Sequence, residues 1–338
     1  MNDNIQIALG FDDNYVMQSG VAITSICINT NHLITFHLVL SGNVTDKNKE
    51  TIRNLVNSYG NNIFFYDIDD TLFVNMPETM HINKAAYNRL LLSEILPQNI
   101  TKVLYLDSDI IALNSIEPLW NINLEIDTPY AAAIDVRCQD ITFQNAIDIP
   151  HSQYYCNNGV LLLNIRCWRK EKLSQQCLDY IRRTKCRWMD QDAVNHVMGH
   201  RVRRLHLKYN LQMAFVRKPK NEWYVDKSFC NEIEEAIANP VILHFSEGEK
   251  PWQEKYSHAN EWLKYKELSP WKNTPLSPAI IKPNAIWLMS EAYKVDADYL
   301  EKCAPAYFRF FSRTAKRHKV VFRLINKFLW LLGDLFGS

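Results

Sequence analysis

In the stretch Lys102-Val103-Leu104-Tyr105-Leu106-Asp107-Ser108-Asp109-Ile110-Ile111, an apolar run ends in two aspartates. The valine, leucine and tyrosine before them predict a buried strand of an α/β sheet. Asp107 and Asp109 are two positions apart, so on extended chain both carboxylates point to the same side. Adjacent anions repel unless a cation lies between them. The pattern predicts a hard-metal site at the C-terminal end of a strand, although such triplets also occur in solvated turns and helix caps.

The composition is that of an ordinary globular protein. With 338 residues, 47% of them hydrophobic and 22% charged, the chain can form one sizeable α/β core or two small domains. Its eight cysteines show neither a C-x-x-C pair nor the spacing of a zinc site. The first four residues, Met1-Asn2-Asp3-Asn4, do not look like the start of a signal peptide. We therefore expect reduced thiols and a cytoplasmic location.

The first part of the chain alternates between strand and helix patterns. Strands are predicted over 5–10, 34–40 and 62–67, and helices over 16–29 and 43–58, the second with Thr45 as its cap. This order implies a parallel sheet with right-handed crossovers, as in Rossmann-like nucleotide folds. The sequence lacks G-x-G-x-x-G, so it does not support dinucleotide binding.

Further elements follow the same logic. Helices are predicted over 85–96, ahead of Pro97, and over 188–198. Apolar strands are predicted over 129–135, 160–165 and 240–245.

Several predicted strands end in polar residues. Asp12 and Asp13 follow the first strand, Asp107 and Asp109 follow the strand quoted above, and the later strands reach Asp135 and His244. Polar groups gathered at one sheet edge predict a ligand site. Two carboxylates and one imidazole suit Mn²⁺, with Mg²⁺ as the alternative and diphosphate oxygens completing the coordination. Taken by itself, the pattern around His244 favours a buried structural histidine over a metal ligand.

Six segments, in this order, resemble the retaining glycosyltransferases of family 8, which include lipopolysaccharide galactosyl- and glucosyltransferases. They cover residues 8–15, 81–90, 103–109, 155–162, 190–192 and 244–252. The resemblance extends over residues 5–272, about four fifths of the chain. It implies a GT-A fold, a nucleotide-sugar donor such as a UDP-hexose, and Mn²⁺.

The resemblance also implies roles for individual residues. Asp107, Asp109 and His244 resemble the metal ligands. The residues that resemble donor-binding positions are Asp12 and Asn14 for the nucleoside, Gly248 and Lys250 for the diphosphate, and Arg89, Asn157, Asp190 and Gln191 for the sugar, with Ser108 beside the metal ligands. Asp135 resembles part of the acceptor side, and we group it with Asp190 and Gln191 as the candidate catalytic residues.

One segment departs from the family pattern. Residues 245–249 read Phe-Ser-Glu-Gly-Glu, where the family more often has glycine one position earlier and fewer acids. Glu247 and Glu249 beside a diphosphate would be unfavourable unless they point outward.

The end of the chain differs from the rest, and we expect a catalytic domain over 1–272 followed by a helical extension over 273–338. From Lys302 on, eight Lys and Arg residues stand against one acid, Asp334, which gives about +7 among many apolar residues. Such a tail fits a helix lying in an anionic membrane interface. A helix packed on its own domain and a nucleic-acid surface are the alternatives. We favour the membrane and expect no nucleic-acid partner.

The predicted function is therefore a metal-dependent retaining glycosyltransferase on the cytoplasmic face of the inner membrane. It would move glucose or galactose from UDP to a lipopolysaccharide core or another glycan, and form an α-linkage. An amide such as Gln191 is a poor nucleophile, so front-side substitution is favoured, with Asp190 holding the sugar. The alternatives are a non-catalytic, membrane-bound sugar-binding module and a phosphohydrolase. In the latter, Ile111 stands where a small Thr or Val is usual.

Overall fold

The computed structural model describes residues 4–69, 84–184, 186, 188–218, 220 and 223–278. They belong to the first of two compact units, Met1–Pro278. The predicted extension over 273–338 lies outside the described residues from position 279 on, as does His81 in the second of the six segments. The domain boundary expected after residue 272 stays a prediction.

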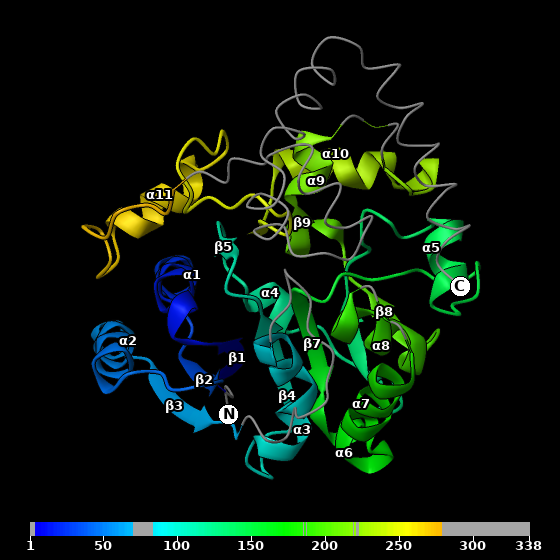
Figure 1. Ribbon diagram of the computed structural model, residues 1–338, viewed down its shortest axis with the longest axis horizontal. Coiled ribbons are helices and arrows are strands. Elements are labelled where there is room, and N and C mark those ends of the chain that lie inside the picture. Colours follow the sequence, from blue (N-terminus) through cyan, green and yellow to red (C-terminus); the bar gives the residue numbers. More distant parts are fainter. Residues whose placement is uncertain are drawn as a thin grey trace, which may run out of the picture. The chain divides into compact units, whose positions relative to one another are not determined.

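Within the described residues, the strands form two sheets (Figure 1). The larger has the order β3-β2-β1-β4-β7-β6-β8, and the smaller has the order β5-β10-β9. The strands are β1 (Ile5–Phe11), β2 (Ile34–Leu40), β3 (Asn62–Asp67), β4 (Lys102–Leu106), β5 (Ile110–Ala112), β6 (Tyr130–Ala132), β7 (Val160–Asn164), β8 (Val202–Arg204), β9 (Leu211–Gln212) and β10 (Ile242–His244).

Helices connect most of these strands. The α-helices are α1 (Val16–Asn29), α2 (Asp46–Ser58), α3 (Leu92–Ile95), α4 (Glu117–Trp120), α5 (Ile141–Ala146), α6 (Ile165–Glu171), α7 (Leu173–Arg183), α8 (Met189–Met198), α9 (Met213–Arg217), α10 (Cys230–Ala238) and α11 (Asn260–Glu267). The 3₁₀ helices are η1 (Asp13–Tyr15), η3 (Lys84–Leu91), η4 (Leu207–Asn210) and η6 (Lys227–Phe229).

The segment predicted as a helix over 85–96 is helical, but most of it is the 3₁₀ helix η3, followed by the short α3. Long-range hydrogen bonds hold this segment in place. The buried amide of Asn88 donates to the Val39 carbonyl at 3.2 Å and accepts from the Ser41 hydroxyl at 2.9 Å. By contrast, the predicted helix over 16–29 is confirmed, and Thr45 caps α2 by accepting from the Asn48 N–H.

Two layers of helices cover the larger sheet, because successive side chains of a strand point to opposite faces. On one face, Ile5, Ile7 and Leu9 of β1 share a core with α1 and α2. On the other face, Ala8 shares a core with α3, α6, α7 and α8. Figure 1 shows α1 and α2 beside β1 to β3, and α6, α7 and α8 grouped near β7. The chain therefore builds the predicted α/β architecture.

Strand direction determines which loops meet. β1 runs parallel to β2 and β4, and β2 runs parallel to β3, as the sequence predicts. β7 runs antiparallel to β4, with Leu106 opposite Val160. The C-terminal ends of β1 and β4 and the start of β7 thus lie at one edge of the sheet.

The described residues nearest the C-terminus pack against α1. Trp252, Trp262 and Tyr265 are buried in the core that contains α1. Gly20 of α1 is in contact with the ring of Trp271, where any larger side chain would overlap it. These aromatic residues are core groups, which leaves no need to assign them to sugar binding.

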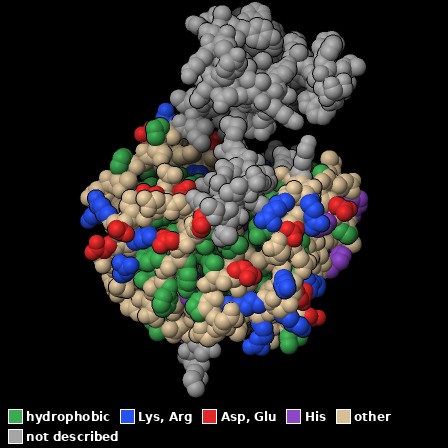
Figure 2. Space-filling model, turned by 60° about the horizontal axis from the view of Figure 1, so that its bottom comes forward, with side chains coloured by type: hydrophobic (Ala, Val, Ile, Leu, Met, Phe, Trp, Pro, Cys, Tyr) green, Lys and Arg blue, Asp and Glu red, His purple; other side chains and the backbone are tan. Residues whose placement is uncertain are grey.

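The surface of the described unit is mixed in charge. Figure 2 shows Lys and Arg side chains interspersed with Asp and Glu over the visible face, with hydrophobic side chains between them. In the described ranges, no helix combines the length and the apolar character that a bilayer crossing requires.

Candidate functional site

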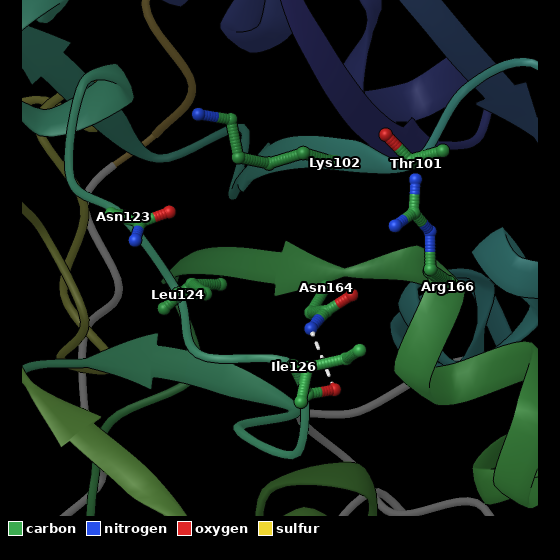
Figure 3. Close-up of a pocket in the computed structure, with 7 residues that line it drawn as sticks. All are labelled: Thr101, Lys102, Asn123, Leu124, Ile126, Asn164 and Arg166. Carbon is green, nitrogen blue, oxygen red and sulfur yellow. Dashed lines mark hydrogen bonds between the residues drawn. The ribbon is translucent and has the colours of Figure 1, made fainter.

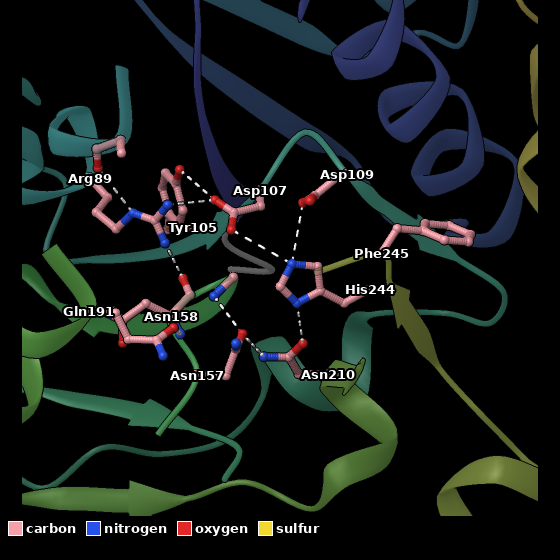
Figure 4. Close-up of polar contacts among 12 residues, drawn as sticks. Arg89, Tyr105, Asp107, Asp109, Asn157, Asn158, Gln191, Asn210, His244 and Phe245 are labelled. Atoms are coloured by element: carbon pink, nitrogen blue, oxygen red, sulfur yellow. Dashed lines mark hydrogen bonds and ion pairs between the residues drawn. The ribbon is translucent and has the colours of Figure 1, made fainter. Parts of the chain in front are cut away.

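The predicted metal ligands lie together (Figure 4). β4 ends at Leu106, the next three residues form the turn that carries Asp107 and Asp109, and β5 pairs antiparallel with β10 so that His244 faces Ile110. His244 Nε2 is 3.2 Å from Asp109 Oδ1 and 3.8 Å from Asp107 Oδ2. The three ligand atoms lie within 4.8 Å of one another. Two carboxylate oxygens and an imidazole nitrogen therefore converge at one point.

Lys250 balances the charge of Asp109. Lys250 Nζ donates to Asp109 Oδ2 at 2.6 Å and to the Phe245 carbonyl at 2.7 Å. Burial opposes the ionisation of Asp109, but Lys250 and His244 outweigh it and keep the pKa of this carboxyl below its ordinary value. Asp109 is consequently an anion at neutral pH, as a metal ligand must be.

Arg89 connects the two acidic parts of the site. Its Nη2 donates to Asp107 Oδ1 at 2.8 Å, and its Nε lies 2.9 Å from Asp190 Oδ2. Its Nη1 donates to the Asn158 carbonyl at 2.6 Å, and the guanidinium stacks over the Tyr105 ring. The arginine is buried, so these pairs are shielded from solvent. Arg89, predicted to contact the donor sugar, directs its nitrogens to protein groups and fixes both carboxylates.

The Asp190-Gln191-Asp192 segment lies in the first turn of α8, and its three side chains have different partners. Burial raises the pKa of Asp190 to about 6, against the influence of Arg89. Gln191 Oε1 accepts from the Asn158 N–H at 3.0 Å, and its Nε2 donates to Asp135 Oδ2 at 3.3 Å. Asp192 accepts from the Tyr155 hydroxyl at 2.6 Å and from the Trp188 N–H at 2.8 Å. Asp192 therefore holds the start of the helix, whereas Asp190 pairs with Arg89 and Gln191 bonds Asp135.

The Asn157-Asn158-Gly159 turn precedes β7 and lies against the predicted metal ligands. The Asp107 N–H donates to the Gly159 carbonyl at 2.9 Å. Asn157 Nδ2 donates to Asp135 Oδ2 at 2.9 Å, and Asn157 Oδ1 accepts from the Gly159 N–H at 3.0 Å. A Cβ at Gly159 would overlap the His244 ring, so glycine is required by close approach. The turn is thus part of the site, beyond its role as a chain reversal.

The acids that depart from the family pattern are neutralised locally. Arg217, at the end of α9, pairs with Glu247 at 3.1 Å and with Glu249 at 2.7 Å. Gly248 lies between these two acids, and a Cβ built there meets nothing within 4 Å. Lys250, the next residue, points instead to Asp109. The two glutamates therefore do not compete with an anion beside Lys250.

The end of β1 supplies the remaining predicted donor contacts. Asp12 is half-buried and accepts from the N–H of the exposed Asn14 at 3.0 Å. Burial raises the pKa of the adjacent Tyr15, which is also sensitive to the charges of Lys250, Asp109 and Asp12, so this loop is close to the metal ligands. Ser108 is different. Its hydroxyl is 2.8 Å from that of Ser19 in α1, so its side chain anchors the turn to that helix.

A hollow of about 290 Å³ lies at the opposite end of β4 (Figure 3). Thr101, Lys102, Asn164 and Arg166 line it, together with Asn123, Leu124 and Ile126. None of the predicted site residues is in this set, so the hollow is separate from the candidate site.

Sequence reasoning missed Tyr105 as a partner of Asp107, Asn210 as a partner of His244, and Arg217 as a partner of the glutamates. Tyr105 donates to Asp107 Oδ1 at 2.9 Å, and Asn210 Oδ1 lies 2.9 Å from His244 Nδ1. Tyr105 was available from the strand pattern, because it lies two residues before Asp107 and points the same way. Asn210 and Arg217 carry no motif that a single sequence reveals.

Comparisons with known proteins identify relatives across this whole unit. Residues 6–256 match the sequence model described as "Glycosyl transferase family 8". General stress protein A of Bacillus subtilis is 27% identical over 278 residues, which cover 80% of this chain and 95% of that protein. A lipopolysaccharide 1,2-glucosyltransferase of Escherichia coli is 28% identical over 294 residues, 83% of each chain.

Among solved structures, the galactosyltransferase LgtC in complex with donor and acceptor sugar analogs is similar, with a TM-score of 0.70 and 24% identity. The similarity covers 79% of this chain and 96% of that chain. At this identity the likeness shows the fold, and it confirms the expected GT-A architecture.

The contact between Gly159 and His244 predicts the effect of adding one methyl group. Gly159→Ala should lower the free energy of unfolding by about 1–3 kcal/mol, because the methyl forces the imidazole or the turn to move. Urea unfolding measures the difference. Gly248→Ala is the matched control, since its methyl meets open space, and it should change stability little. Equal stability of the two variants would contradict the packing described here.

Proposed function

Since the chain belongs to glycosyl transferase family 8, we propose that it transfers glucose or galactose from a UDP-sugar to a glycan acceptor with retention of configuration. The acceptor is a lipopolysaccharide core or another lipid-linked glycan, and the new bond is an α-linkage. The names of the relatives support a hexose donor, because they include glucosyl- and galactosyltransferases. The family also favours a transferase over the alternative of a phosphohydrolase.

The observation that carries the proposal is the convergence of Asp107, Asp109 and His244 beside Lys250. This set of two carboxylates and one imidazole fits Mn²⁺, or Mg²⁺ as the alternative. A divalent ion held there supplies a Lewis acid that stabilises the charge developing on the leaving diphosphate. Lys250 adds a second positive charge at the same place, and the peptide around Gly248 contributes backbone contacts to the diphosphate.

The donor extends from these ligands in two directions. Asp12 and Asn14, at the surface end of β1, contact the nucleoside, with the backbone at Ser108 beside them. Asp190 and Asn157 hold the hexose, and Arg89 fixes Asp190 through their ion pair. Asp135 and Gln191, joined by a hydrogen bond, border the acceptor side. In this arrangement, polar side chains contact the nucleoside and the hexose on either side of the metal-bound diphosphate.

Retention follows from front-side substitution in this proposal. Both ends of the Gln191 amide are already hydrogen-bonded, and an amide is a poor nucleophile. The acceptor hydroxyl then attacks from the face that the diphosphate leaves, and a leaving phosphate oxygen takes its proton. Asp190 stabilises the positive charge that develops at the sugar ring.

We further propose that residues 273–338 bind the anionic surface of the cytoplasmic membrane, where a lipid-linked acceptor lies. The support is the net charge of about +7 after residue 301, mixed with apolar residues.

The first test is release of UDP from a panel of UDP-sugars, with Mn²⁺ or with EDTA. One UDP-hexose should give release that EDTA abolishes, and Asp109→Ala should reduce the rate by roughly 10²–10³-fold, because a metal ligand and the partner of Lys250 are lost. No release from any donor, with binding of UDP-sugar unaffected by EDTA, would instead indicate a sugar-binding module.

Two neighbouring aspartates allow a matched comparison on one helix. Asp190→Asn should lower kcat/KM by about 10–100-fold, because it removes the carboxylate that Arg89 orients toward the sugar. Asp192→Asn should lower the Tm and leave turnover per folded molecule close to wild type, since Asp192 accepts hydrogen bonds from the buried Tyr155 hydroxyl and the Trp188 N–H. The assignment of roles fails if the two variants exchange these effects.

Membrane association is measured with the full chain and lipid vesicles. Sedimentation should show binding to vesicles containing anionic lipid and little binding to zwitterionic ones, and added salt should weaken it. Lys316→Glu combined with Arg317→Glu should reduce binding, because it reverses two positive charges of the tail. Equal binding to both kinds of vesicle would contradict the proposal that the tail binds anionic lipid electrostatically.

A further inference from the structure

A continuous chain of hydrogen bonds runs from Asp135 to His244 through two asparagine amides. Asn157 Nδ2 lies 2.9 Å from Asp135 Oδ2, Asn210 Nδ2 lies 2.9 Å from Asn157 Oδ1, and Asn210 Oδ1 lies 2.9 Å from His244 Nδ1. All four side chains are buried. Figure 4 shows Asn210 between Asn157 and the imidazole, on the side of the ring away from the two aspartates.

The order of donors and acceptors along these hydrogen bonds is fixed, and Asp135 sets it. Three donors converge on its carboxylate: the Arg137 N–H at 2.9 Å, the Asn157 amide and the Gln191 amide. A carboxylate accepts only, so Asn157 must turn its NH₂ group toward it. The Asn157 oxygen also accepts from the Gly159 N–H, which fixes the same orientation independently.

Asn210 continues the same order of donors and acceptors to the imidazole ring of His244. Because Asn157 presents its oxygen, Asn210 must present its NH₂ group to that oxygen and its own carbonyl oxygen to His244. An imidazole nitrogen that faces an oxygen acceptor at 2.9 Å must carry a hydrogen. With the opposite arrangement of hydrogens, two acceptors would face each other in a buried site, which is costly.

We propose that Asn210 is a positioning residue that holds neutral His244 as its Nδ1–H tautomer, so that the Nε2 lone pair faces Asp107 and Asp109. The proposal rests on the metal-dependent function, because a cation needs that lone pair. Without Asn210, the neutral ring would favour a hydrogen on Nε2, where Asp109 Oδ1 accepts it from 3.2 Å. The hydrogen bond to Asn210 instead favours the hydrogen on Nδ1, and this leaves the Nε2 lone pair free to bind a cation.

The backbone holds Asn210 at this place. It ends η4, and the next residue, Leu211, pairs with Leu243 beside His244 in the parallel ladder of β9 and β10. The Val241 N–H also donates to the Lys208 carbonyl at 2.8 Å. These backbone contacts therefore fix the main chain of Asn210 beside His244, within reach of its side-chain amide.

The tautomer can be observed directly in metal-free protein. Nitrogen NMR of protein labelled with ¹⁵N-histidine distinguishes the two neutral forms at alkaline pH, and His244→Gln identifies the signals of His244. The wild type should show Nδ1–H, and Asn210→Leu should shift His244 toward Nε2–H. A wild-type His244 that carries its hydrogen on Nε2 would overturn the proposal, and this measurement needs no folded variant of Asn210.

Metal affinity gives a second readout. Titration with Mn²⁺ alone should show about 10–100-fold weaker binding by Asn210→Leu than by wild type. Asn61→Leu is the matched control, because Asn61 is a buried asparagine that bonds Cys27 and the Ile34 N–H, and its affinity for Mn²⁺ should not change. Wild-type affinity in Asn210→Leu would contradict the proposal. Neither measurement uses a sugar donor, so a protein with the expected tautomer but no transfer would count against the proposed function alone.

Discussion

The site depends on the repulsion between two aspartates placed two residues apart at the end of a buried strand. Asp107 and Asp109 cannot both be ionised in a low-dielectric environment unless positive charge surrounds them. The fold supplies that charge from two distant parts of the chain, as Arg89 and Lys250. The cluster is therefore ready for a cation before one binds, because the same groups that stabilise the acids also orient them.

The arrangement divides into a charged half and an amide half. Arg89 joins Asp107 to Asp190, so the group proposed to hold the sugar is coupled electrostatically to a metal ligand. On the other side, Asn157 and Asn210 link Asp135 to His244 by neutral hydrogen bonds. The proposed metal ligands lie where the two halves meet, so residues far apart in sequence come together at one place.

Much of the fold and part of the site follow from local sequence pattern. The strands over 34–40 and 62–67 and the helix over 16–29 have the predicted bounds, because their patterns and flanking turns are strong. Asp107 and Asp109 follow a strand of the larger sheet, as predicted, but His244 reaches them from β10 of the smaller sheet and not from the same sheet edge. The antiparallel direction of β7 and the 3₁₀ form of η3 depend on tertiary contacts. So do the Arg217 pairs and the place of Asn210, which a single sequence does not encode locally.

The contact of Gly20 with Trp271 has a consequence for synthesis on the ribosome. α1 is made among the first residues, yet the aromatic segment that covers part of it is made near the end of the described unit. His244 likewise reaches the aspartates only after β10 has been translated. The nascent chain therefore carries an incompletely covered apolar helix through most of translation, and the candidate site is completed late because it requires long-range pairing.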